Sequence, residues 1–404
     1  MAMDDRISTM PNEILFHIIS SLPFDSAKQT ILLSKRFKFL WETSLVQHGT
    51  YEDTSNAISK FLTNFNEQDP SKNTRKLLFH FINGGFLVAI IAPNHNLILD
   101  FSNGNQENCV QFTLRLGFIN SQPSSTFTFL VKKLHLIAIS YLTTEVVSCI
   151  TSNFRFLETL KITSCNGLQS LSIDSDTKLL SLTIFDCLQL EFLHIRSFKL
   201  RIFRFRGLLP SLWPEYHYNL VEAFLDFRQG PRMMIDRDFG SVLLTIKNVK
   251  VLTLCKWTFE ALMCPLLSTF VAEFQFYNVK EVWWIESSFE KYDCDSLISF
   301  LKLCPSLEQL FVTIDPKCYS MEKTTKYSLE AGKNTKLKHL KMVTLDGFAK
   351  EADEIYLAQC LQQIITCEPL IFASAGRSNW TTRLKKSTEN VVNQMCPKHL
   401  HMSL

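Results

Sequence analysis

The sequence lacks every short motif that marks a common enzyme active site. It contains no G-x-S-x-G nucleophile elbow, no phosphate-binding P-loop, no H-E-x-x-H zinc motif and no G-x-G-x-x-G dinucleotide fingerprint. Its 12 cysteines include no C-x-x-C pair, so the spacing of a zinc finger is missing too. Most of them stand beside apolar residues, which favours buried free thiols in a reducing compartment. These absences predict a protein that is not an enzyme and that requires no cofactor and no metal.

Long apolar runs and a strong charge of one sign are also missing. The longest apolar run, Phe86 to Ala92, is far too short to span a membrane. The first residues, Met1 to Ser8, are polar and acidic, which is unlike a signal peptide. A net charge of +3 is too small to indicate nucleic-acid binding. We therefore expect an intracellular protein, in the nucleus or the cytoplasm, that binds neither a membrane nor nucleic acid.

Two local patterns leave alternatives open. The run Lys35-Arg36-Phe37-Lys38 alternates basic and aromatic residues, which suits either a nucleic-acid patch or the solvated face of an amphipathic helix. We favour the helix. Cys396, His399 and His401 offer metal-ligand chemistry near the end of the chain. Because this stretch is short and terminal, a frayed tail is the favoured interpretation.

The first forty-five residues carry the signals of three short helices. Pro11 suits the first turn of a helix, and apolar residues then recur at helical spacing up to Leu22, where Pro23 ends the pattern. Asp25 and Ser26 can cap a second helix, and Ser34 a third, whose apolar face includes Leu40. Helices this short cannot bury all their apolar faces against one another. The segment therefore predicts a docking surface for a partner.

The same residues resemble a known family. Asp5 to Leu15 looks like the opening of a plant F-box, Ser20-Ser21-Leu22-Pro23 like its middle, and Leu33 to Trp41 like its closing helix. In that family the motif docks on a Skp-family adaptor, which links it to a cullin scaffold. The resemblance implies an adaptor-binding set with these members: Pro11, Ile14, Leu15, Ile18, Leu22, Pro23, Leu33 and Leu40.

The match departs from the family pattern at two positions. Met10 stands where the family usually has Leu, and Phe37 stands where it usually has Trp. Both replacements remain apolar, so the resemblance still implies docking, with an altered affinity. The alternative is that these residues only pack the three helices together.

A repeat of apolar residues dominates the middle of the chain. Alternation in Leu77, Phe79 and Phe81, and again over 112–118, predicts strands with one buried face. From residue 157 an 11-residue unit follows, with starts at Leu157, Leu168, Leu179, Leu190 and Leu200, the last one 10 residues after its predecessor. Two units make one turn of about 22 residues, which is the length and pattern of a leucine-rich repeat. The sequence therefore predicts an α/β chain in which a helical module precedes a curved solenoid with parallel strands.

The end of the chain adds a second resemblance. Leu345-Asp346-Gly347-Phe348, followed by an apolar helical stripe, looks like the FBD region of many plant F-box proteins, although Cys367 to Ile371 departs from its usual closing strand. The expected organisation has four parts, which are an F-box at 1–48, repeats at 49–336 (clearest at 157–205), an FBD-like repeat at 337–375 and a polar basic tail at 376–404.

Two features of the repeats bear on what they bind. In Trp283-Trp284 the indoles of a strand point to opposite faces, so one of them is exposed or both pack in core regions, and we favour the second reading. Outward-facing positions of the best repeats hold five polar residues, which predict a polar row ending in basic groups or simply a solvated face: Lys161, Ser172, Thr183, His194 and Arg204.

Together these patterns favour one function and leave one alternative. The resemblance implies a substrate-recognition adaptor of an SCF-type ubiquitin ligase, in which the F-box holds the Skp-family adaptor and the repeats select an unknown protein substrate. The alternative is a protein-binding scaffold that works outside a ligase and carries a degenerate F-box. Phe37 is the residue that keeps this alternative open.

Overall fold

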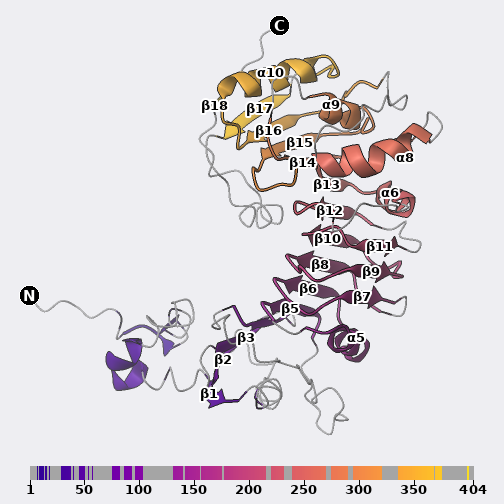
Figure 1. Cartoon of the computed structure of the whole chain (residues 1–404). Helices are drawn as coiled ribbons and strands as arrows, with labels where there is room; N and C mark the ends of the chain where they lie inside the picture. Colours follow the sequence, from indigo (N-terminus) through magenta and orange to yellow (C-terminus); the bar gives the residue numbers. More distant parts are fainter. Residues whose placement is uncertain are drawn as a thin grey trace, which may run out of the picture. The chain divides into compact units, whose positions relative to one another are not determined.

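The computed structural model describes most of the repeat region and parts of the first hundred residues (Figure 1). The described residues are 7, 9–12, 14, 15, 18, 29–37, 40, 45–50, 53, 57, 75–81, 86–92, 96–102, 131–139, 142–154, 156–174, 177–214, 220–231, 239–269, 274–289, 294–320, 335–367, 369–374, 398 and 399. The chain divides into two compact units. Unit 1 holds residues 1–169 and 177–179, and unit 2 holds residues 170–176 and 180–404.

Unit 1 contains a mixed sheet with strands in chain order. The strands are β1 (Leu45–Gly49), β2 (Arg75–Phe81), β3 (Phe86–Ala92), β4 (Asn96–Asp100), β5 (Lys133–Ile137) and β6 (Thr159–Thr163). The pairs β1–β2, β4–β5 and β5–β6 are parallel. Helix α5 (Thr144–Asn153) supplies the crossover between β5 and β6 that a parallel pair requires, and the side chain of Thr143 caps its first turn.

The pairing of β2, β3 and β4 differs from the parallel array that was expected from residue 49 onward. Both β2–β3 and β3–β4 are antiparallel. The reason is local, because only four residues separate β2 from β3 and three separate β3 from β4, by subtraction of their bounds. Such short connections permit hairpins and exclude a crossover. Strand β2 itself was predicted correctly, whereas the expected strand over 112–118 lies outside the described residues.

Unit 2 is built on a long parallel sheet. Its parallel strands follow one another in space as they do in sequence, as the ladder of arrows in Figure 1 shows: β8 (Ser181–Phe185), β10 (Ile202–Arg206), β12 (Glu222–Asp226), β13 (Val251–Cys255), β14 (Glu281–Glu286), β15 (Gln309–Ile314), β16 (Met342–Asp346) and β17 (Leu370–Ser374). The short strand β18 (Lys398–His399) pairs antiparallel with β17. The predicted parallel pairing of the repeats is therefore confirmed for β8 to β17 of unit 2 and for β4, β5 and β6 of unit 1.

A second sheet lies opposite the first coils of unit 2. It consists of β7 (Ser170–Ile173), β9 (Phe192–Ile195) and β11 (Ser211–Pro214), again in parallel. These strands alternate along the chain with β8 and β10, so each pair of 11-residue units makes one coil with a strand in either sheet. The second apolar residues of these units, such as Leu171, Leu182 and Leu193, are almost fully buried. Each coil thus buries its leucines against its neighbours, as the repeat pattern predicted.

Helices replace the second sheet in the later coils, as Figure 1 shows on the side of α6 and α8. These elements are α6 (Gly240–Ile246), α7 (Lys256–Thr258), the π-helical turn η5 (Phe259–Met263), α8 (Cys264–Thr269), α9 (Asp295–Leu301) and α10 (Glu351–Gln362). The predicted helical stripe of Leu297, Phe300 and Leu301 lies on α9 and is buried. Cys304 is also buried, which confirms its expected place in the core. No helix in the described part of the chain is long and apolar enough to cross a membrane.

Residues with positive φ end several of the parallel strands. Ala138, Ser164 and Asp186 have φ between 53° and 57°, and glycine takes the matching place after β10 and β16. This turn redirects the chain from the sheet into the next side of the coil. Gly347, in the predicted Leu345-Asp346-Gly347-Phe348 segment, has a φ of +77°, and a Cβ there would lie 2.3 Å from the carbonyl oxygen of Ile314.

Candidate functional site

The amino-terminal segment has a buried side that holds it together. Leu15, Phe37 and Leu40 are at most 6% exposed. The backbone N–H of Phe37 donates to Ser34 Oγ at 3.2 Å, which confirms the predicted cap of the third helix. The guanidinium of Arg36 donates to Asn12 Oδ1 at 2.7 Å and also to the backbone oxygen of Met10. The start of the first helix is therefore fastened to the third.

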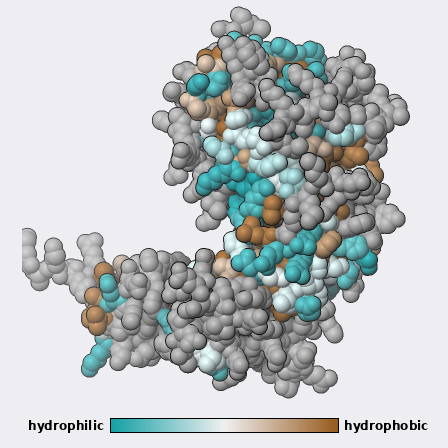
Figure 2. Space-filling view, viewed as in Figure 1, coloured by the Kyte–Doolittle hydropathy of each residue, from teal (hydrophilic) through white to brown (hydrophobic). Residues whose placement is uncertain are grey.

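The same segment leaves a set of large apolar side chains in solvent. This exposed apolar group, with exposed fractions from 41% to 87%, consists of Ile7, Ile14, Ile18, Leu32 and Leu33. Leu32 closes the 3₁₀-helix η1 (Thr30–Leu32). Figure 2 shows hydrophobic residues in brown over the segment that Figure 1 colours indigo. Exposed apolar side chains gathered in so short a segment are typical of a protein-docking surface.

The structure separates the implied adaptor-binding residues into two groups. Pro11, Ile14, Ile18 and Leu33 are exposed. Leu15 and Leu40 are buried instead, while Leu22 and Pro23 lie outside the described residues. The contact of the whole set with an adaptor stays a prediction. A mutation that reports on docking alone has to be placed in the exposed group.

The two departures from the family pattern concern the inside of the segment. Phe37 is 6% exposed, so the ring fills the interior and not the exposed apolar group. Met10 contributes its backbone carbonyl to Arg36, which any residue at that position would offer. Arg36 is itself engaged in these internal contacts, and Lys35 is exposed. This arrangement favours the amphipathic-helix interpretation of the basic run.

The outward face of the parallel sheet in unit 2 carries an aromatic pair. Trp283 on β14 and Phe311 on β15 are register partners, and their rings stack with centroids 3.9 Å apart and an angle of 5°. Both side chains are partly exposed, whereas the neighbouring Trp284 is fully buried. The expectation that both tryptophans pack in the core is therefore wrong for Trp283. Alternation along the strand places the two indoles on opposite faces.

Charged groups border this aromatic pair. The indole Nε1 of Trp283 donates to Glu281 Oε1 at 2.5 Å. Burial raises the pKa of Glu281 above its ordinary value, although the indole hydrogen bond opposes the shift. Further along the face, Arg204 donates two hydrogen bonds to the Glu222 carboxylate, at 2.6 and 3.0 Å. The face thus offers flat apolar surface next to fixed carboxylates.

The predicted polar row of five residues does not exist as one row. Lys161, Thr183 and Arg204 lie on strands β6, β8 and β10, whereas Ser172 and His194 lie on β7 and β9 of the second sheet. The 11-residue spacing concealed this division, because successive units alternate between the two sheets. Thr183 is also only 6% exposed. Sequence reasoning missed Phe311 as the partner of Trp283, although both residues occupy the same place in their repeats.

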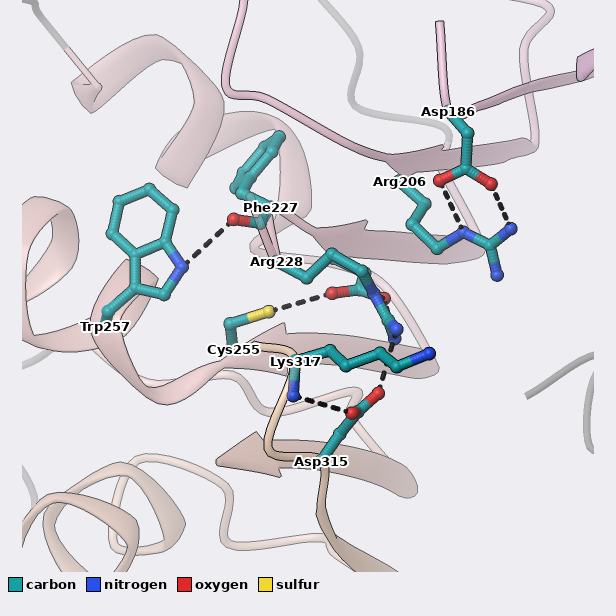
Figure 3. A network of polar contacts seen from close by, with 9 residues as sticks. Asp186, Arg206, Phe227, Arg228, Cys255, Trp257, Asp315 and Lys317 are labelled. Carbon is teal, nitrogen blue, oxygen red and sulfur yellow. Dashed lines mark hydrogen bonds and ion pairs between the residues drawn. The ribbon is translucent and has the colours of Figure 1, made fainter. Parts of the chain in front are cut away.

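A polar network joins the carboxyl ends of the parallel strands (Figure 3). Arg206 and Asp186 form a two-pronged ion pair across β10 and the turn after β8. Arg228 donates from Nε to Asp226 Oδ2 at 2.7 Å and from Nη1 to Asp315 Oδ2 at 2.8 Å. Asp226 is fully buried, and that burial raises the pKa of its carboxyl in spite of the neighbouring guanidinium. The network ties the turn after β12 to the segment after β15.

Three residues of metal-ligating types, one carboxylate and two thiols, meet within this network. The ligand atoms of Asp226, Cys255 and Cys318 all lie within 4.8 Å of one another, and all three residues are buried. The Cys255 thiol donates to Asp226 Oδ1 at 3.1 Å. Sequence reasoning did not find this cluster, because its members are 29 and 63 residues apart by subtraction and share no short motif. The described residues contain no other such group of three.

Comparison with known proteins finds a match for the amino-terminal segment and a match for the repeat region. Residues 7–46 match the F-box domain. Curated relatives match over short segments only. The "F-box/LRR-repeat protein At5g02910" of Arabidopsis thaliana is 45% identical over 62 residues, or 15% of this chain and 14% of the relative. The "Putative F-box/FBD/LRR-repeat protein At5g56810" of the same plant is 53% identical over 38 residues, or 9% of each chain.

The repeat region gives the most extensive match. Residues 96–389 match the family described as "At1g61320/AtMIF1, LRR domain". This range covers more than half of the chain and contains the parallel strands of unit 2 up to β17. The chain joins this region to an amino-terminal F-box domain, and it belongs to the family of the At1g61320/AtMIF1 LRR domain.

Proposed function

We propose that this protein is the substrate-recognition subunit of an SCF-type ubiquitin ligase. The F-box docks on a Skp-family adaptor, which connects it to a cullin, and the repeats select a protein substrate. The observation that carries the proposal is the exposed apolar group of the F-box, above all Ile14 and Leu33, at 48% and 66% exposure. It is supported by the domain match at 7–46. In this role the chain performs no catalysis and acts in the nucleus or the cytoplasm.

The exposed apolar group can supply a substantial part of the docking energy. Complete burial of an isoleucine or leucine side chain contributes about 1.5–3 kcal/mol, so a half-exposed one contributes about 1 kcal/mol when a partner covers it. The buried residues Leu15, Phe37 and Leu40 keep the group in place. An aspartate within the covered surface would instead bury an unpaired carboxylate, at a cost of several kcal/mol.

The docking test uses exposed positions so that folding is preserved. Ile14→Asp and Leu33→Asp, each in the full chain co-expressed with a plant Skp-family adaptor, should weaken adaptor binding by at least about 30-fold. Leu244→Asp is the matched control, because Leu244 is a 42% exposed leucine on α6 of the repeat region. Full adaptor binding by both F-box variants would refute the proposal. Loss of binding in the control would show a general folding defect.

The proposed substrate surface is the outward face around Trp283 and Phe311. A stacked pair of partly exposed rings beside Glu281 suits a polypeptide segment that presents a basic or planar side chain. Trp283→Ala and Phe311→Ala should lower the recovery of ubiquitinated substrate in affinity mass spectrometry with a proteasome inhibitor. Tyr277→Ala removes a 57% exposed aromatic residue elsewhere and serves as the control. Unchanged recovery in both sheet variants would exclude this face.

The carboxyl-terminal region completes the proposed substrate-binding part. Helix α10 and the parallel strand β17 follow the Leu345-Asp346-Gly347-Phe348 segment, which suits the proposed FBD-like repeat at 337–375. The alternative function is a scaffold that works outside a ligase. The interior place of Phe37 favours the ligase role, since the replacement leaves the exposed group unchanged. Co-purification with a Skp-family adaptor distinguishes the two functions.

A further inference from the structure

The buried cluster at the carboxyl ends of β12 and β13 has the composition of a metal site. Asp226 and Cys255 are the last residues of these adjacent strands, and Cys318 comes from the segment after β15. Their ligand atoms lie within 4.8 Å of one another, and Cys255 Sγ is 3.1 Å from Asp226 Oδ1. Zinc–ligand bonds of about 2.0–2.3 Å place the ligand atoms of a tetrahedral site about 3.3–3.8 Å apart, so these three atoms need an inward shift of at most about 1 Å to bind one ion.

The Asp226 carboxylate is already oriented for such a role. Arg228 holds Oδ2 through Nε at 2.7 Å, which leaves Oδ1 directed at Cys255. Partners that fix the far oxygen of a ligating carboxylate are usual around protein metal ions. Arg228 is fixed in turn by Asp315 at 2.8 Å. The geometry therefore provides an oriented oxygen beside two sulfur atoms, all from buried residues.

The charges also suit a divalent cation. Binding of one doubly charged ion with release of the two thiol protons leaves the net charge of the region unchanged. Thiolate ligands select zinc over magnesium or calcium.

We propose that Asp226 Oδ1, Cys255 Sγ and Cys318 Sγ together bind one Zn²⁺ ion. The two thiol protons pass to the solvent as the zinc–sulfur bonds form, and no redox change takes place. Three protein ligands leave a fourth position for water. The ion joins the segment after β15 to the ends of β12 and β13, alongside the hydrogen bond of 2.6 Å from the Tyr319 N–H to the Arg228 carbonyl oxygen. Its role is to fasten a surface segment onto the repeat sheet.

The test measures bound metal in the purified full chain, prepared under reducing conditions without a polyhistidine tag. We expect about one zinc per chain by elemental analysis, and near-complete loss of that zinc in Cys255→Ser and Cys318→Ser. Cys187→Ser is the control, because Cys187 is as buried as Cys318, at 5% exposure, and its thiol donates to the carbonyl oxygen of Phe185, the last residue of β8. Retained zinc in both cluster variants would overturn the assignment.

A second measurement removes the dependence on co-purified metal. The metal-depleted wild-type chain is titrated with Co²⁺, whose thiolate complexes absorb strongly in the near ultraviolet. Saturation at one equivalent, abolished by Cys318→Ser and preserved in Cys187→Ser, supports the site. A folded, reduced chain without this absorption contradicts it. So does a Cys255–Cys318 disulfide found by mass spectrometry after purification under reducing conditions. None of these outcomes depends on the proposed ligase function.

Discussion

Gly347 offers a sharp test of how the coils are joined. Its φ of +77° costs a residue with a side chain about 1–2 kcal/mol. A Cβ there would also lie 2.3 Å from the carbonyl oxygen of Ile314, which belongs to the backbone of β15 and cannot rotate away. Forcing a methyl group into such a site adds about 1–3 kcal/mol. Gly347→Ala should therefore destabilise the folded chain by about 2–5 kcal/mol.

Gly230 provides the matched comparison. Its φ of +78° is nearly the same, but the Cβ there would meet the ring of Tyr319 at 2.7 Å instead of backbone. Tyr319 is 40% exposed, so its ring has room to move into solvent. Gly230→Ala should cost the conformational part, about 1–2 kcal/mol, and about 1 kcal/mol more as the Tyr319 ring leaves its edge contact with Trp257.

The assay is urea unfolding of both variants, followed by circular dichroism. Because repeat arrays can unfold in parts, the midpoint and the slope are both compared with those of the wild type. Equal destabilisation by the two alanines would refute the reasoning, since the fixed carbonyl of Ile314 is the difference between the sites. A stable Gly347→Ala variant would show that β15 and β16 can separate more easily than the structure implies.

Three further predictions follow from the repeats. The surface carboxyl of Glu308 has its pKa lowered to about 2, and the largest cause is the hydrogen bond from Lys280. The stability that this shift contributes is present above the unfolded pKa near 4.5 and is lost as the pH falls towards 2. Lys280→Gln should raise the pKa of Glu308 in a carboxyl NMR titration. Trp284→Ala should cost about 3–5 kcal/mol in urea unfolding because the indole is fully buried, and Trp283→Ala clearly less; equal losses would contradict the assigned faces. Deletion of residues 1–48 should preserve substrate binding while abolishing substrate ubiquitination, and a folded truncation that binds no substrate in pull-downs would refute this division of roles.

The sequence by itself determined where the repeats lie and which of their residues are buried. The spacing of Leu157, Leu168, Leu179, Leu190 and Leu200 located five successive units, and each of these leucines is buried. Alternation along a strand and periodicity along a helix are local properties, so they survive in the sequence without knowledge of any partner. The cap by Ser34 is equally local, and it was predicted for the same reason.

Only the tertiary structure decided which units lie side by side. The 11-residue spacing is the same for strands of either sheet, so the sequence could not show that Ser172 and Arg204 belong to different surfaces. The stacking of Trp283 on Phe311 and the meeting of Asp226, Cys255 and Cys318 depend on the register of strands far apart in the chain.

In the F-box, too, the sequence predicted the apolar stripe, and the tertiary structure decided which of its residues are buried. Helical spacing placed Ile14, Leu15 and Ile18 on one apolar stripe, but the stripe is wider than the surface that the neighbouring helices cover. Leu15 falls inside the covered part, and Ile14 and Ile18 remain exposed. Which side chain of an apolar stripe packs inside and which awaits a partner depends on the neighbouring helices, because burial is a property of the assembled surface and not of the residue.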